Sequence, residues 1–130
     1  MKQPESEKIT INLGFVDLGH VDLLVREGFY GNRTDFIRTA IRNQLDRHGD
    51  AARQSTTRRQ LQLGLCHYSA QDLEAARVAG EMLDIRVLGL ATIAPDVTPE
   101  LALATIGSVT VLGAFHASPA VRAALAGRII

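Results

Sequence analysis

The sequence predicts an α+β protein made of two parts with different character. An N-terminal unit should form one strand and two helices, and a small C-terminal module should form a solenoid-like α/β repeat. Three observations predict this: strict polar/apolar alternation at residues 8–14, two helical patterns directly after it, and three related Leu/Gly-rich segments after residue 60. We expect domains at residues 1–47 and 60–130, joined by a polar segment at residues 48–59 that is a linker or a frayed helix extension.

The first expected element is a strand over KITINLG, residues 8–14. Polar and apolar side chains alternate there with the two-residue period of a half-buried strand. The polar residues are Lys8, Thr10 and Asn12, and the apolar residues are Ile9, Ile11 and Leu13. No second strand-like segment lies nearby, so we expect this strand to pair antiparallel with its twin in a second copy of the chain.

Two helices are expected next. Asp17 is a suitable N-cap for the first helix, and Gly28 suits the left-handed position after its end. Asn32 should cap the second helix, with Asp35 three residues on in a capping-box-like position. The expected apolar faces are Leu18, Val21, Leu24 and Val25, and then Phe36, Ile37, Ala40, Ile41 and Leu45. A unit of about 40 residues cannot bury two such faces alone, so we expect a homodimer through residues 7–47.

A ribbon of two such strands would fit the major groove of B-DNA, which is about 12 Å wide. Lys8 can donate to guanine, Asn12 can make two hydrogen bonds with adenine, and Thr10 can serve either base. The start of the second helix offers unpaired N–H groups that can bind phosphate. These groups belong to Asn32, Arg33 and Thr34.

KITINL, then a helix ending at REG, then NRTDFIRTAIRNQL resembles the ribbon-helix-helix superfamily of Arc, MetJ and CopG regulators. The resemblance covers residues 7–47, and NRTDFIRTAIR is its most specific part. GFVDLGH departs from the short polar or proline-containing turn that the family has between strand and helix. The resemblance implies a dimer that binds double-stranded DNA. The implied base-reading residues are Lys8, Thr10 and Asn12, and the implied phosphate contacts are Asn32, Arg33 and Thr34.

Three segments after residue 60 are similar to one another. They begin at Leu63, Leu88 and Leu112, which are 25 and 24 residues apart, and each predicts a strand followed by a short helix. Ser69, Thr98 and Ser118 precede these helices, and Pro99 and Pro119 lie in first turns. Units this small need to stack as parallel strands about 4.8 Å apart. The final GRII shows no polar cap, so we expect higher oligomers through residues 60–130.

Composition argues against several classes of protein. The net charge is zero, which is unlike general polyanion binders, although residues 42–59 hold five Arg and two Asp. The sequence contains no run of 18 apolar residues, so it predicts no membrane span. The segment MKQPESEK lacks the apolar core of a signal peptide. Cys66 has no second cysteine to pair with. We therefore expect a cytoplasmic, nucleoid-associated protein.

No motif points to catalysis, so we expect no enzyme, no catalytic residues, no metal and no cofactor. His67 and His116 share a column with Thr92 in the expected stack. Positions two strands apart are separated by about 10 Å, too far for two ligands of one zinc ion. A metal site between copies stays open, and Cys66 is expected to be a small core residue.

The predicted function is a sequence-specific DNA-binding transcriptional regulator, expected to be a repressor, with a C-terminal module that drives higher-order assembly. Three alternatives stay open. The protein could be an antitoxin whose C-terminal module binds a toxin. It could be a scaffold that uses the N-terminal unit only to dimerise. It could also be a sensor whose repeat module binds a small effector.

Overall fold

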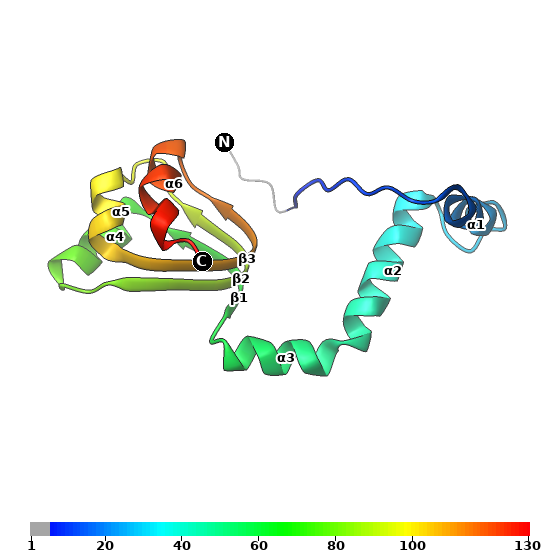
Figure 1. Cartoon of the computed structure of the whole chain (residues 1–130), viewed down its shortest axis with the longest axis horizontal. Helices are drawn as coiled ribbons and strands as arrows, with labels where there is room; N and C mark the ends of the chain where they lie inside the picture. The colour runs from blue at the N-terminus through cyan, green and yellow to red at the C-terminus, as the bar shows by residue number, and fades with distance from the viewer. Residues whose placement is uncertain (1–5) are drawn as a thin grey trace. The chain divides into compact units, whose positions relative to one another are not determined.

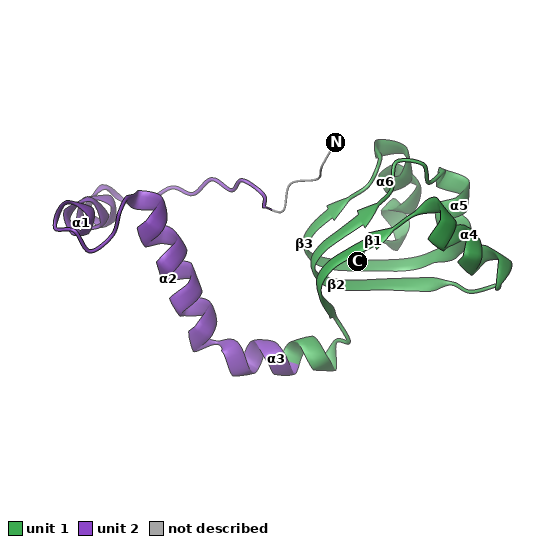
Figure 2. Cartoon of the chain, turned by 180° about the vertical axis from the view of Figure 1, so that it is seen from behind, with its two compact units in different colours: residues 1–5, 55–130 green, residues 6–54 purple. Residues whose placement is uncertain are grey.

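The computed structural model describes residues 6–130; the start of the MKQPESEK segment, residues 1–5, lies outside the described residues. The chain is mixed α and β, as predicted, and divides into two compact units, residues 6–54 and residues 55–130 (Figure 2). The boundary falls inside helix α3 (Gly49–Arg58), within the segment expected to be a polar linker. Within residues 6–130 no helix has the length and apolar character needed to cross a membrane.

The first helix, α1 (Phe15–Arg26), begins earlier than its expected N-cap. Gly14 precedes the helix in extended conformation, whereas Asp17 lies in the first turn. The Asp17 prediction is therefore wrong in position, although an acidic side chain there still favours the positive end of the helix dipole. At the other end, Gly28 has a φ of 87° and donates its N–H to the Val25 carbonyl at 3.1 Å. The predicted left-handed position of Gly28 is confirmed.

The second helix, α2 (Arg33–Arg47), is capped by Asn32 as predicted. The Asn32 side-chain oxygen accepts the Asp35 N–H at 2.8 Å. The Asp35 carboxylate accepts the Gly31 N–H at 2.9 Å, one residue before the partner that a capping box would use. Tyr30 stands edge-on to Phe36, with ring centroids 5.0 Å apart, so the loop packs onto the start of α2.

The unit of residues 6–54 buries very little in one chain. Val21 is the one buried hydrophobic residue within this described range, and Leu45 on α2 is 64% exposed. Residues 7–14 form no strand in the single chain, and Ile9 and Ile11 are 72% and 55% exposed. A strand needs a hydrogen-bonded neighbour, and the expected neighbour is a second copy. Pairing of the two strands therefore stays a prediction.

The unit of residues 55–130 is built on a parallel sheet whose strand order is β1–β2–β3. Its strands are β1 (Gln62–Tyr68), β2 (Leu83–Ile93) and β3 (Ile106–His116), and its helices are α4 (Ala70–Val78), α5 (Pro99–Thr105) and α6 (Pro119–Leu125). The strand–helix order and the parallel pairing agree with the sequence. All three helices lie on one side of the sheet, inside the bend of its long strands (Figure 1).

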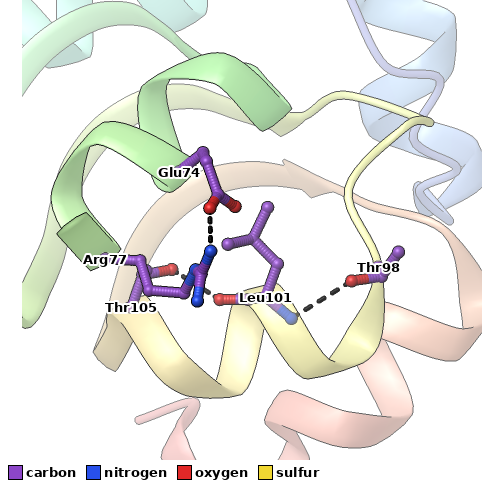
Figure 3. Close-up of polar contacts among 5 residues, drawn as sticks. All are labelled: Glu74, Arg77, Thr98, Leu101 and Thr105. Atoms are coloured by element: carbon purple, nitrogen blue, oxygen red, sulfur yellow. Dashed lines mark hydrogen bonds and ion pairs between the residues drawn. The ribbon is translucent and has the colours of Figure 1, made fainter.

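Each helix of this unit begins at the predicted hydroxyl residue. Ser69 and Asp72 form a complete capping box at the start of α4. Thr98 accepts the Leu101 N–H at 3.2 Å (Figure 3). Ser118 caps α6 in the same way, by accepting the Val121 N–H. The buried Thr105 hydroxyl donates to the Leu101 carbonyl at 2.7 Å, which satisfies a polar group in the core. Figure 3 also shows the Glu74–Arg77 ion pair of α4 beside α5.

A row of glycines crosses the sheet. Gly64 pairs with Gly89 and Gly89 with Gly113, and their φ values are 120°, 141° and 120°. A Cβ on Gly89 would lie 2.2 Å from the Gly64 carbonyl oxygen, and one on Gly113 would lie 2.1 Å from that of Gly89. Only glycine therefore fits at positions 89 and 113. The long strands bend around the helices (Figure 1).

The core lies between the helices and the inner face of the sheet. Ile85, Val87 and Ala91 alternate along β2 and are fully buried, together with Leu73 of α4. Cys66 on β1 is half-buried and packs against this core, as expected for a small core residue. The outer face of the sheet carries exposed leucines, among which Leu63 is 74% exposed.

The C-terminal residues correct one expectation about the end of the sheet. The final GRII was expected to leave the last strand uncovered. Instead α6 continues into a 3-10 helix, η1 (Ala126–Arg128), and Ile129 then pairs parallel with Val109 of β3. The Ile130 N–H donates to the Val109 carbonyl at 2.8 Å, and Arg128 donates to the Ile106 carbonyl at 2.8 Å. This segment covers the edge of β3 around Val109.

Candidate nucleic-acid interface

The three residues expected to read bases lie in the segment before α1. Lys8, Thr10 and Asn12 are all exposed. In the single chain, the apolar residues between them are exposed as well. One copy alone therefore has no buried face and no opposite solvent-exposed face along this segment. The structure leaves the three polar side chains accessible, and their orientation toward DNA depends on the second copy.

The three residues expected to bind phosphate form the start of α2. The Asn32 side chain is used by the helix cap, so its part in an anion site would come from its backbone. Arg33 and Thr34 are the first two residues of α2, where N–H groups have no partner within a helix. The positive end of the helix dipole lies at the same place. The local geometry is therefore suited to a phosphate oxygen.

An ion pair that the sequence did not predict joins the two helices at this site. The Arg33 guanidinium donates two hydrogen bonds to the Asp22 carboxylate of α1, Nε to Oδ1 at 2.7 Å and Nη2 to Oδ2 at 2.8 Å. Both side chains remain about half exposed. The hydrogen bond from Arg33 lowers the pKa of Asp22, and the same bond raises the pKa of Arg33. In the free chain the Arg33 side chain is thus already bound to a carboxylate.

The histidine column of the C-terminal unit has the register expected from the sequence. His67 is aligned with Thr92, and Thr92 with His116, so the two histidines lie two strands apart. Within residues 6–130 no group of three or more His, Cys, Asp or Glu side chains is arranged to hold a metal ion. Burial raises the pKa of Tyr68 on β1, a phenol half-buried beside Cys66.

A helix pair that follows an extended segment with alternating polar and apolar side chains is the architecture of the β-ribbon class of DNA-binding transcriptional regulators. The ribbon-helix-helix transcriptional regulator family matches residues 4–122, and the chain belongs to that family. Regulators of this family bind DNA, usually dimerise and are typically not enzymes. The family resemblance expected from residues 7–47 is confirmed, and the match also spans most of the C-terminal unit. No match was found among curated proteins or solved structures.

Proposed function

We propose that the chain is a sequence-specific transcriptional repressor whose residues 7–47 form a symmetric dimer. Residues 8–13 of two copies would pair as an antiparallel ribbon that enters the major groove of DNA. In this proposal the bases are read by Lys8, Thr10 and Asn12, and phosphates are bound by Asn32, Arg33 and Thr34. The unit of residues 55–130 would join dimers on neighbouring sites.

The observation that carries this proposal is the exposure of alternate apolar residues beside the helix pair. Ile9, Ile11 and Leu13 are 72%, 55% and 41% exposed, and the neighbouring α2 has no buried residue. Large apolar side chains that repeat on one face of a strand are normally covered. A second copy would cover all of them at once, and the same pairing would turn the three polar residues to the opposite face.

The C-terminal unit bears on one of the three alternative functions, the antitoxin. Toxin-binding regions of antitoxins are often disordered until they bind, whereas residues 55–130 have a buried core of their own around Leu73, Ile85 and Val109. This favours an assembly role over an antitoxin. A scaffold differs from the proposed repressor in a measurable respect: it would show no DNA binding with the steep salt dependence that phosphate contacts impose.

The experiment that tests the function is selection from a randomised DNA pool with the full chain. The wild type is expected to enrich a short repeated or palindromic motif. Replacing Lys8, Thr10 and Asn12 by alanine should abolish that enrichment, because the main donors and acceptors for base edges are removed. Each of Lys8→Ala and Asn12→Ala should cost about 1–3 kcal/mol at its matching base.

A matched control is Asn43→Ala, which removes an exposed asparagine from α2 far along the helix from its N-terminus. This variant should keep the wild-type motif. The ribbon is not the reader if the triple variant enriches the same motif as the wild type. Absence of any motif for the wild type at modest salt would favour the scaffold.

The Asp22–Arg33 ion pair predicts that a mutation on α1 strengthens DNA binding. Asp22→Asn removes the carboxylate that holds the Arg33 guanidinium, so this group becomes free to bind a phosphate. We expect higher affinity and a slope of log K against log salt that is steeper by about 0.9, the value for one further phosphate contact. Affinity measured between roughly 50 and 200 mM salt checks this.

Asp17→Asn is the matched control, since it removes the same charge from α1 without freeing an arginine. It should change affinity slightly and leave the slope unchanged. Because the Asp22 pKa is lowered, the ion pair is complete at neutral pH and is lost as pH falls through that lowered pKa. A wild-type slope that is already as steep as that of Asp22→Asn would show that Arg33 leaves Asp22 when DNA binds.

A further inference from the structure

The two edges of the C-terminal sheet have different lengths available for pairing. In the described chain β1 and β3 are the edge strands, and each pairs with β2 alone along most of its length. The edge of β3 is occupied near its start, where Ile129 pairs with Val109. Beyond that point, from Val111 to Phe115, no other strand among residues 6–130 pairs with its outer side.

The register inside the chain determines how β1 of another copy would fit this edge. Gln62 is aligned with Val87, and Val87 with Val111. A copy of β1 placed beside β3 with this same register would therefore begin at Val111 and cover residues 111–117. Ile129 lies opposite Val109, two residues before the start of the stretch that this copy of β1 would cover. Residues 111–115 of β3 would thus align with residues 62–66, the greater part of β1.

We propose that β3 of one chain pairs in parallel with β1 of a second copy, in the register that the chain uses twice within itself. This inference rests on the proposed role of residues 55–130 in assembly, and names the surfaces that carry it. The contact joins two different surfaces, so it is head-to-tail. Contacts of that kind continue from copy to copy instead of closing as a two-fold pair.

The glycine of β1 supports this second-copy contact. Gly89 and Gly113 have positive φ values, and a Cβ on either would strike the carbonyl of the preceding strand. Gly64 has the same φ as Gly113, 120°, yet a Cβ built on it meets nothing within 4 Å. In the proposed contact, Gly113 of the first chain stands beside Gly64 of the second, as Gly64 stands beside Gly89 within one chain. The open space at Gly64 is then filled by a carbonyl.

The side chains along these edges are also consistent with a further neighbour. On the outer face, Leu63 of the second copy would stand beside Leu112 of the first; they are 74% and 51% exposed in one chain. On the inner face, Tyr68 and Phe115 of the edge strands are half-buried, whereas Ile93 of the middle strand is buried. Pairing would give both edge strands the surroundings that β2 already has.

Two double variants, one with like charges and one with opposite charges at the contact, test the contact and its register together. Leu65 is aligned with Leu90, and Leu90 with Ala114, so Leu65 of one copy would stand beside Ala114 of the next. Within one chain these two positions are about 10 Å apart, whereas across the contact they are about 5 Å apart. Leu65→Lys with Ala114→Lys places like charges side by side, and Leu65→Lys with Ala114→Glu places opposite charges there.

Sedimentation velocity of the full chain at micromolar concentration is the measurement. The wild type is expected to form species larger than a dimer, the Lys/Lys variant to fall to the dimer, and the Lys/Glu variant to recover the larger species. Leu103→Lys on the middle helix α5 is the matched control and should behave as the wild type. Circular dichroism checks that every variant is folded.

Three results would overturn the proposal. They are a wild type that is only dimeric, a Lys/Lys variant that assembles like the wild type, and a Lys/Glu variant that remains dimeric. Binding to a single DNA site is measured on the same samples. The Lys/Lys variant should keep this binding, so failure of the edge contact is distinguishable from failure of DNA recognition.

Discussion

Gly89→Ala is expected to unfold the C-terminal unit. The new Cβ would lie 2.2 Å from the Gly64 carbonyl oxygen, a backbone atom that cannot move without parting β1 from β2. Alanine is also strained at the φ of 141° that Gly89 adopts. Strain and clash together should cost at least about 3 kcal/mol, a large part of the stability of a unit this small. Thermal unfolding followed by circular dichroism checks the result.

Substitutions at two other glycines separate the contributions of steric clash and backbone strain to this loss of stability. Gly127→Ala introduces a Cβ into open space at an ordinary φ, so it should change stability by no more than about 0.5 kcal/mol. Gly64→Ala has the positive φ but no clash within one chain, and should cost about 1–3 kcal/mol. A Gly89→Ala variant as stable as Gly64→Ala would mean that the two strands separate at little cost.

Ile11→Ala is expected to destabilise the N-terminal unit far more than its exposure in one chain indicates. Ile11 is 55% exposed in the single chain, and truncation of such a residue normally changes stability by about 0.5 kcal/mol or less. In the proposed ribbon the same side chain lies in a core shared by two copies. Truncation to alanine in a packed core costs about 2–5 kcal/mol. Denaturant unfolding at a fixed protein concentration distinguishes the two values.

Thr10→Ala is the matched control, because Thr10 neighbours Ile11 but belongs to the polar set. It should leave unfolding unchanged while weakening DNA binding. If Ile11→Ala is as stable as the wild type, residues 8–13 are not a core strand of the dimer. The DNA-reading role of the polar residues would then lose its structural basis.

The C-terminal unit was the more predictable part in its local structure. The spacing of Leu63, Leu88 and Leu112 fixed the strand register, because each apolar strand must present the same face to its neighbour. Hydroxyl residues before each helix predicted the helix starts, since they are the preferred N-caps. These signals are local in sequence, so a single chain contains them in full.

Other features depend on contacts that local patterns do not encode. The Asp22–Arg33 pair spans 11 residues and two helices, so no helical spacing indicates it. The start of α1 was misplaced because Asp17 is as favourable in the first turn as it is at a cap. Helix α3 lacks large apolar residues but contains two alanine and two arginine residues, which are strong helix formers. The polar pattern left a linker and a frayed helix extension both open. Which face the expected base-reading residues present depends on pairing with a second chain.

The parallel pairing of neighbouring repeats has a consequence for folding speed. Paired positions of the three strands join residues 23 to 25 apart in the chain, a short separation for a parallel sheet. Closing loops of that length costs little chain entropy, and folding rates rise as contacts become more local. Folding of this unit therefore needs no search for strand partners that are distant in the chain.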